Sequence, residues 1–199
     1  VWVYGYDTFE PLIWFWRALL GNPDALAKEA DSLRKHKDYY YGYRGLPKED
    51  FNLIKEELRN EKEYSLQNAA KFYALNRSSF SGATLSGGWS KRASYERFTD
   101  SSITRIREFN QPKLYVSAQH FKHSIPAHPK TFLYLDPPYL LGKDKENLYG
   151  DAGNKHKGFD HAGLVNILKE RDNWILSYNN CPEILKLYEG YDIIYPDWK

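Results

Sequence analysis

The stretch TFLYLDPPYLLG, residues 131–142, joins an apolar run to an aspartate, two prolines and a tyrosine. Its first half, TFLYLD, has the composition of a buried β-strand that ends on a charge. The two prolines fix the backbone angle φ and remove two N–H donors. The groups left to face outward are the Asp136 carboxylate, backbone carbonyls and the Tyr139 ring. This stretch therefore predicts a strand that ends in a site of hydrogen-bond acceptors with an aromatic wall.

Strands and helices alternate around this stretch. After Pro112 the patterns predict, in order, a strand, a strand, a helix, a strand, a helix and a strand: KLYVSA, TFLYLD, FDHAGLVNILKERD, WILSYN, CPEILKLY and YDIIYP. Such alternation is typical of a parallel, doubly wound sheet. At the start of the chain, residues 1–6 predict another buried strand, which ends at Asp7, and two helices follow as far as Lys37.

The middle of the chain has a different character. Residues 39–111 contain several helical patterns but no stretch typical of a buried parallel strand. We therefore expect an α/β domain formed by residues 1–38 and 112–199, divided in sequence by a mostly helical insertion of residues 39–111. One long irregular segment, residues 140–158, follows the two prolines, and a loop of this length in a compact domain is usually functional or disordered.

Composition limits the classes of protein to consider. The chain has 199 residues and a formal net charge of +2, and no apolar run reaches the roughly 20 residues that a membrane-spanning helix needs. Cys181 is the only cysteine, which excludes an internal disulfide and favours a reducing compartment. The sequence contains no methionine, and both of its ends have strand-like patterns. We therefore expect it to be a fragment of a longer protein.

An acceptor site at the end of a parallel strand suits a particular kind of ligand. In open α/β sheets, ligands bind outside the carboxyl ends of the strands. A planar NH₂ group, such as the exocyclic amino group of a nucleobase, would donate its hydrogens to Asp136 and a neighbouring carbonyl. Asp136 would also stabilise positive charge that develops on that nitrogen. Tyr139 would stack on the base, which must first leave the duplex. The alternative is a stiff turn without chemistry.

The LDPPY sequence in this setting resembles the catalytic motif of DNA methyltransferases that modify amino groups with S-adenosylmethionine. Its aspartate form is similar to that of the Dam-like adenine-N6 enzymes. Further segments resemble the same family, and together they cover nearly the whole chain: VYGYDTFEPLIWFW, YYYGYRGLPKEDFN, AAKFYALNRSSFSG, YVSAQHF, FDHAGLVNIL and WILSYNN. Their order is like that of the α group. The resemblance implies an α/β fold with a Rossmann-like methyltransferase sheet and a mostly helical target-recognition insertion.

The resemblance also implies roles for the residues that match. The catalytic motif, called here the DPPY motif, comprises Asp136, Pro137, Pro138 and Tyr139. S-adenosylmethionine would contact Asp7 through its ribose hydroxyls, and it would contact Phe121 through its adenine ring. Asp136 would lie beside the cofactor as well as beside the target base.

The insertion would contact double-stranded DNA. The residues expected to do so are Arg44, Asn76, Arg77, Lys91, Arg92 and Arg97, together with Lys143 and Lys145 of the segment after the DPPY motif. Such side chains suit contact with phosphates and bases. The alternative is a solvated face, the usual position of scattered Lys and Arg. We expect residues 140–158 to be mobile without DNA and to close over the flipped adenine.

Two features depart from the family pattern. The Gly-rich first motif of Rossmann-like folds lies about 20 residues before the ribose-binding acid, whereas only six residues precede Asp7. We therefore expect residues 1–199 to bind S-adenosylmethionine weakly or not at all. The Dam enzymes that recognise GATC also carry an arginine shortly after the residue that matches Gly82, but here the next arginine is Arg92. The target sequence is therefore not expected to follow from theirs.

These observations lead to one expected function and two alternatives. We expect a monomeric DNA adenine-N6 methyltransferase, cytoplasmic and of prokaryotic or phage origin, of the kind found in restriction-modification systems. One alternative is a non-catalytic DNA-binding module derived from such an enzyme. The other is an RNA or protein amide methyltransferase, although these usually carry Asn in place of Asp136. We expect no metal, because no Cys or carboxylate cluster completes a ligand set with His120, His123 and His128.

Overall fold

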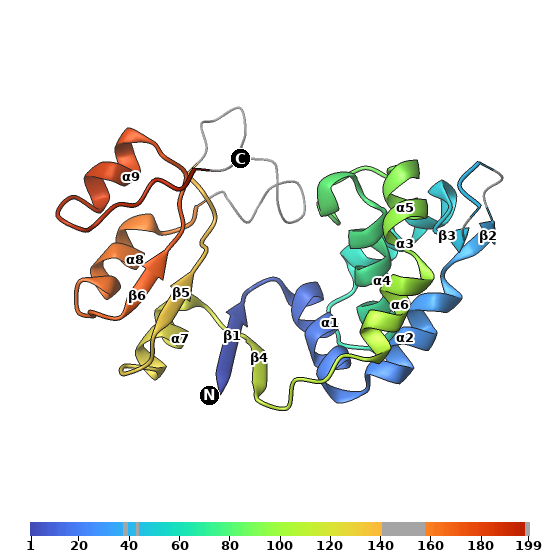
Figure 1. Ribbon diagram of the computed structural model, residues 1–199, viewed down its shortest axis with the longest axis horizontal. Coiled ribbons are helices and arrows are strands. Elements are labelled where there is room, and N and C mark those ends of the chain that lie inside the picture. Colours follow the sequence, from blue (N-terminus) through green and yellow to red (C-terminus); the bar gives the residue numbers. More distant parts are fainter. Residues whose placement is uncertain (38–39, 43, 141–157, 198–199) are drawn as a thin grey trace.

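A computed structural model describes residues 1–37, 40–42, 44–140 and 158–197 of the chain. Its elements follow in the order β1 Val3–Asp7, α1 Glu10–Gly21, α2 Pro23–Ser32, β2 Lys35–Lys37, β3 Arg44–Gly45, α3 Lys48–Asn60, α4 Leu66–Ser78, η1 Phe80–Gly82, α5 Lys91–Arg97, α6 Asp100–Arg107, β4 Leu114–Ala118, α7 Phe121–Ala127, β5 Leu133–Leu135, α8 His161–Leu168, β6 Trp174–Leu176 and α9 Pro182–Leu187. Figure 1 shows β1 and β4 between two bodies, with the helices α1–α6 on one side and α7–α9 with β5 and β6 on the other.

The parallel strands form two separate pairs among the described residues. β1 pairs with β4, which places Asp7 opposite Ala118. β5 pairs with β6, which places Leu135 opposite Leu176. A short antiparallel pair joins β2 and β3. The predicted mixed α/β class with parallel strands is therefore confirmed, but these residues do not form the single doubly wound sheet that the sequence predicts.

Side chains rather than backbone hydrogen bonds link β1 to the segment before β5. The Tyr6 hydroxyl lies 2.6 Å from Nε2 of His128, a residue between α7 and β5. The rings of Tyr4 and His128 also pack together, with their centroids 4.7 Å apart. These contacts hold the two strand pairs beside each other without a shared backbone ladder.

Three sequence predictions differ from the observed elements. The strand at the start is not buried, because Val3 is 56% exposed and, among the described strands, only β4 pairs with it. The predicted strand YDIIYP, residues 191–196, does not form, and Ile194 in it is 86% exposed. A strand needs a partner for its backbone groups, and no described strand pairs with this segment. The second helix ends at Ser32 rather than near Lys37, since residues 35–37 pair with β3.

Helix starts follow local signals. Side chains at several N-caps accept a hydrogen bond from a backbone N–H in the first turn, which is the preferred role of these residue types; they are Asn22, Ser65, Ser90, Thr99 and Asp160. Proline lies in the first turn of α1, α2 and α9, where its missing N–H leaves no helical hydrogen bond unmade.

The larger apolar core lies among the helices α1–α6. Its fully buried side chains come from elements far apart in sequence and include Leu26, Leu46, Phe51, Leu58, Leu75 and Phe98. Helices α1 and α2 pack against α4, and α2 also packs against α6. Two helices that precede residue 39 thus share a core with the helices of the predicted insertion. The boundary between residues 38 and 39 stays a prediction.

A smaller core lies under β5 and β6. Its buried residues come from α7, α8, α9 and the turn after α9, and they are Ile125, Leu164, Val165, Leu168, Ile184 and Tyr188. Side chains of both strands pack against it, among them Leu133, Leu135, Trp174 and Leu176. Because one face of the strand pair rests on this core, the carboxyl ends of β5 and β6 have a fixed support.

A buried arginine lies at the centre of an ion-pair network in the helical body. The Arg34 side chain is 1% exposed, and its Nη1 donates to Oδ1 of Asp31 at 2.8 Å and to Oδ1 of Asp100 at 2.6 Å. Arg44 Nη2 lies 3.0 Å from the same Asp31 oxygen. The hydrogen bond from Arg34 lowers the pKa of the Asp100 carboxyl below its ordinary value. The network therefore ties α6 to the end of α2.

We expect Asp100→Asn to lower the free energy of unfolding at neutral pH by about 1 kcal/mol or less, because the Asp100 carboxylate is largely exposed and solvent screens the pair. The folded pKa lies below the unfolded one, so Asp100 stabilises the fold above about pH 4, and this contribution is lost as the pH falls through the folded pKa. Urea unfolding of both proteins at neutral pH and near pH 3 measures it. A difference that stays constant with pH would contradict the ion-pair role.

Candidate active site

Asp136 directly follows β5, at the carboxyl end of the β5–β6 pair. The backbone N–H of Ser177, the residue after β6, donates to the Leu135 carbonyl at 2.9 Å and extends the pairing by one residue. The Ser177 hydroxyl then donates to Oδ1 of Asp136 at 2.6 Å. Asp136 is exposed, and its Oδ2 accepts no hydrogen bond from any described residue. The carboxylate is thus held at one oxygen and open at the other.

The rest of the DPPY motif is held from the same neighbouring segment. Asn179 Nδ2 donates to the carbonyl of Leu140, the residue after the motif, at 2.8 Å. Tyr139 is 37% exposed, and its ring centroid lies 6.2 Å from that of Tyr178. Both ends of the motif therefore contact residues 177–179, while one part of the Tyr139 ring stays accessible.

A row of aromatic rings connects Tyr139 with Phe121. Beyond Tyr178, the next ring is that of His161, whose centroid is 5.7 Å away and whose Nδ1 lies 2.5 Å from the Tyr178 hydroxyl. Phe159 follows at 4.9 Å from His161, and Phe121 at 5.1 Å from Phe159. Burial raises the pKa of the Tyr178 hydroxyl, which therefore stays neutral. The structure thus brings the predicted stacking residue and a predicted cofactor residue to one aromatic cluster.

Asp7 lies at the carboxyl end of the other parallel pair. Its Oδ1 accepts a hydrogen bond from the backbone N–H of Phe9 at 2.7 Å, and Asp7 is exposed. Phe121 begins α7, three residues after Ala118, which lies opposite Asp7. Asp7 and Phe121 therefore lie at the same end of the β1–β4 pair. Figure 1 shows that the carboxyl ends of β1 and β6 point to the same side of the molecule.

Three predicted DNA-binding residues support the loop that follows α4. Asn76 Nδ2 donates to the Gly82 carbonyl at 3.0 Å. Arg77 donates from Nε and Nη2 to the Arg97 carbonyl at 2.9 and 2.8 Å, and Arg97 Nη2 donates to the Ser79 carbonyl at 2.5 Å. Burial, with the charge of Arg77, lowers the pKa of the Arg97 guanidinium. All three side chains therefore donate to backbone carbonyls of the part of the chain formed by α1–α6.

The other predicted DNA-binding residues are more exposed. Arg44 belongs to the network around Arg34. Lys91 Nζ lies 5.7 Å from the centre of the Tyr41 ring. The Arg92 side chain is 80% exposed, and its Nε lies 2.7 Å from Glu96. Lys143, Lys145 and the predicted closing movement of residues 140–158 fall mainly on residues 141–157, which are outside the described part of the chain.

The loop after α4 also presents an aromatic side chain that the sequence analysis matched to a motif but did not assign to DNA. Phe80 is 72% exposed, although its backbone N–H donates to the Gly88 carbonyl at 2.9 Å. Ser81 and Thr84 have positive φ angles of 51° and 48°, which are uncommon for residues other than glycine. The loop is thus folded tightly while its large apolar side chain faces solvent.

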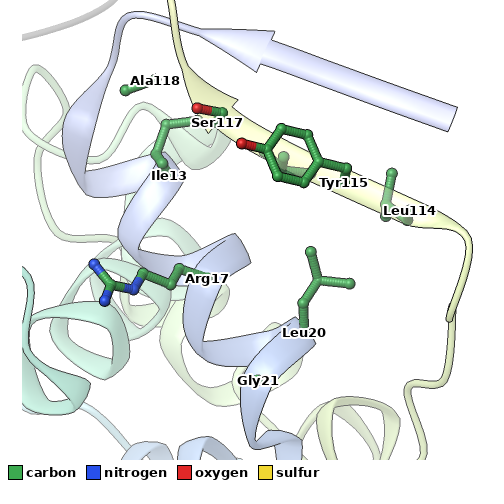
Figure 2. A pocket seen from close by; sticks show the side chains of 9 residues that line it. Ile13, Arg17, Leu20, Gly21, Leu114, Tyr115, Ser117 and Ala118 are labelled. Atoms are coloured by element: carbon green, nitrogen blue, oxygen red, sulfur yellow. The ribbon is translucent and has the colours of Figure 1, made fainter.

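The described residues also form a hollow between α1 and β4. It measures about 460 Å³ and is lined by Ile13, Arg17 and Leu20 of α1 and by Leu114, Tyr115 and Ser117 of β4, as Figure 2 shows. The Arg17 guanidinium carbon lies 4.1 Å from the centre of the Tyr64 ring. No predicted site residue lines this hollow, so we assign no chemistry to it.

Two further observations concern metals and membranes. Within the ranges that the structure describes, no three His, Cys, Asp or Glu side chains come together in an arrangement that could hold a metal ion. None of the helices in the same ranges combines the length and the apolar character that crossing a membrane requires.

We expect Arg97→Met to lower the free energy of unfolding by about 1–3 kcal/mol, because the Ser79 and Asn76 carbonyls lose a charged donor. Arg92→Met removes the same charge from an exposed side chain with a partner four residues away, and it should leave the stability unchanged. Denaturant unfolding of the two variants measures the difference. Equal stability of both variants would contradict a supporting role for Arg97.

A comparison with known protein families gave a match over nearly the whole chain. Residues 3–199 match the family described as D12 class N6 adenine-specific DNA methyltransferase. The match spans Asp7, Phe121 and the whole DPPY motif. A comparison with curated proteins gave no match. The resemblance noted in the sequence is therefore confirmed, and the chain belongs to the D12 class of DNA adenine-N6 methyltransferases.

Proposed function

We propose that a protein that contains this chain transfers a methyl group from S-adenosylmethionine to N6 of adenine in double-stranded DNA, with Asp136 as the main acceptor for the adenine amino group. The observation that carries the proposal is the hydrogen bonding of the two Asp136 carboxylate oxygens. One of its oxygens accepts from Ser177 at 2.6 Å, and the other accepts from no described residue. The two prolines that follow bring no N–H donor of their own.

The proposed chemistry uses acceptors to activate a poor nucleophile. Oδ2 of Asp136 and the Pro137 carbonyl accept the two amino hydrogens of adenine, which favours a pyramidal N6 with an available lone pair. S-adenosylmethionine, when bound, supplies the methyl group. The Asp136 carboxylate stabilises the positive charge that develops on N6, and N6 finally gives up one proton to water. Tyr139 offers a partly exposed ring for stacking on the flipped base.

The residues at the carboxyl end of β1–β4 fit parts of S-adenosylmethionine. Asp7 has one oxygen fixed by the Phe9 N–H and an exposed carboxylate, which suits two ribose hydroxyls. Phe121 packs against Phe159 and His120, with ring centroids 5.1 and 4.5 Å away, and so forms an aromatic wall for the adenine ring. On this proposal both parallel pairs belong to one Rossmann-like catalytic domain, residues 1–38 and 112–199.

The helical insertion, residues 39–111, is the proposed target-recognition region. Lys91 and Arg92 begin α5 and would contact phosphates. Phe80 would insert between bases or stack on them, as exposed apolar side chains do in proteins that distort DNA. Asn76 and Arg97 would act on DNA through the loop whose carbonyls they hold, and Arg77 would act through Arg97, whose carbonyl it holds.

We expect Asp136→Ala to reduce methyl transfer at least about a hundredfold, because the developing charge on N6 loses its stabilising carboxylate. Incorporation of labelled methyl groups into mixed-sequence duplex DNA measures this, in a protein that also includes sequence before Val1. The Kd for DNA, from fluorescence anisotropy, should change less than about threefold.

Asp172→Ala is the matched control, since Asp172 is an exposed carboxylate in the turn before β6, and it should keep the wild-type rate. Similar rates for the two variants would contradict the role of Asp136. Specific DNA binding without methyl transfer by the wild-type protein, with sequence before Val1 included, would instead favour the non-catalytic module.

Phe80→Ala should weaken DNA binding about tenfold, because stacking of a base on an aromatic ring contributes roughly 1–3 kcal/mol. Its thermal midpoint should stay close to that of the wild type, since the side chain is 72% exposed. Phe132→Ala, which removes a ring that is 63% exposed just before β5, should leave the affinity unchanged. An equal loss of affinity in the two variants would contradict a specific role of Phe80.

A further inference from the structure

We infer that Ser177 and Asn179, called here the clasp, are positioning residues for methyl transfer. Ser177 holds the Asp136 carboxylate, and Asn179 holds the backbone at the other end of the DPPY motif. Neither residue belongs to the motif itself. The inference rests on the proposed function, because it assigns to the clasp the orientation of the acceptors that the proposed reaction uses.

The contact of Ser177 with Asp136 is short and well supported. Its length of 2.6 Å lies within the range of about 2.5–2.7 Å for a hydroxyl that donates to a charged oxygen. The backbone of Ser177 is fixed in turn by its 2.9 Å hydrogen bond to Leu135. Because Oδ1 is engaged, the rotation of the carboxylate is restricted and Oδ2 is left as its open acceptor.

Asn179 acts on the opposite end of the motif. Its Nδ2 donates to the Leu140 carbonyl at 2.8 Å. Since φ is fixed at Pro137 and Pro138, tying both ends of the short segment leaves little freedom for the Pro137 carbonyl and the Tyr139 ring between them. The clasp residues lie two positions apart in the segment that directly follows β6.

Stability alone does not account for the clasp. Asp136 is exposed, so water could solvate its carboxylate, and a hydrogen bond between accessible groups adds little to the free energy of unfolding. Asn179 Oδ1 is buried and has no hydrogen-bond partner among the described residues, a cost that an apolar side chain would avoid. The effect of these contacts is to fix orientation, and orientation governs the rate of methyl transfer.

The test compares side chains of matched shape. Ser177→Ala should lower kcat about ten- to hundredfold, while KM for S-adenosylmethionine and Kd for DNA stay within about threefold. Ser177→Thr keeps the hydroxyl and should keep most of the rate. Ser177→Val has the shape of threonine without the hydroxyl and should behave like Ser177→Ala. Asn179→Asp keeps its shape, loses the N–H donors and should also lower kcat.

The control is Ser32→Ala, which removes an exposed hydroxyl that donates at 2.7 Å to the Glu29 carbonyl in α2, and it should leave kcat unchanged. Equal kcat values for Ser177→Thr and Ser177→Val would overturn the inference, and this pair decides the matter if Ser177→Ala fails to fold. A loss confined to KM or Kd would overturn it as well. The proposed function fails separately, if Asp136→Ala still methylates adenine.

Discussion

The backbone hydrogen bond from Ser177 to Leu135 is the contact on which the proposed active site depends. It carries the pairing of β5 and β6 one residue past the strands, to the position where the DPPY motif begins. A slip of this register by one residue would turn the Ser177 side chain to the opposite face. The hydroxyl contact with Asp136, the amide contact with Leu140 and the ring contact with Tyr139 all follow from this one alignment.

The two apolar cores support different tasks. The smaller core, under β5 and β6, holds the strand ends that carry Asp136 and Ser177. The larger core holds the helices from which the loop with Phe80 projects. Two arginines help to hold this loop, since Arg97 donates to the Ser79 carbonyl directly after α4 and Arg77 donates to the Arg97 carbonyl at the end of α5. We therefore assign catalysis to the part of the chain that packs on the smaller core, and DNA contact to the part that packs on the larger core.

Local features could be predicted from the sequence, and features that depend on distant partners could not. The strands β1, β4, β5 and β6 each have an apolar run in the sequence. The acceptor site can be predicted as well, because proline has no backbone N–H donor. Pairing depends on which segments meet, so YDIIYP has a strand's composition but no described partner. The positive charge of Arg97 favoured DNA contact, whereas its hydrogen bond to Ser79 depends on the folded loop. Ser177 lies in WILSYNN, a segment that resembles the family, but the resemblance gives this serine no role. Aligning the ends of TFLYLD and WILSYN would have placed it beside Asp136.

The identity of the methylated atom tests this account most directly. Duplex DNA that contains all four bases is incubated with the protein and methyl-labelled S-adenosylmethionine, hydrolysed to nucleosides and analysed by mass spectrometry. If Asp136 and the Pro137 carbonyl hold the amino group of adenine, the label should appear in N6-methyldeoxyadenosine. Label on a ring carbon, as in 5-methyldeoxycytidine, would contradict the account, because such a carbon has no amino hydrogens for these acceptors to bind.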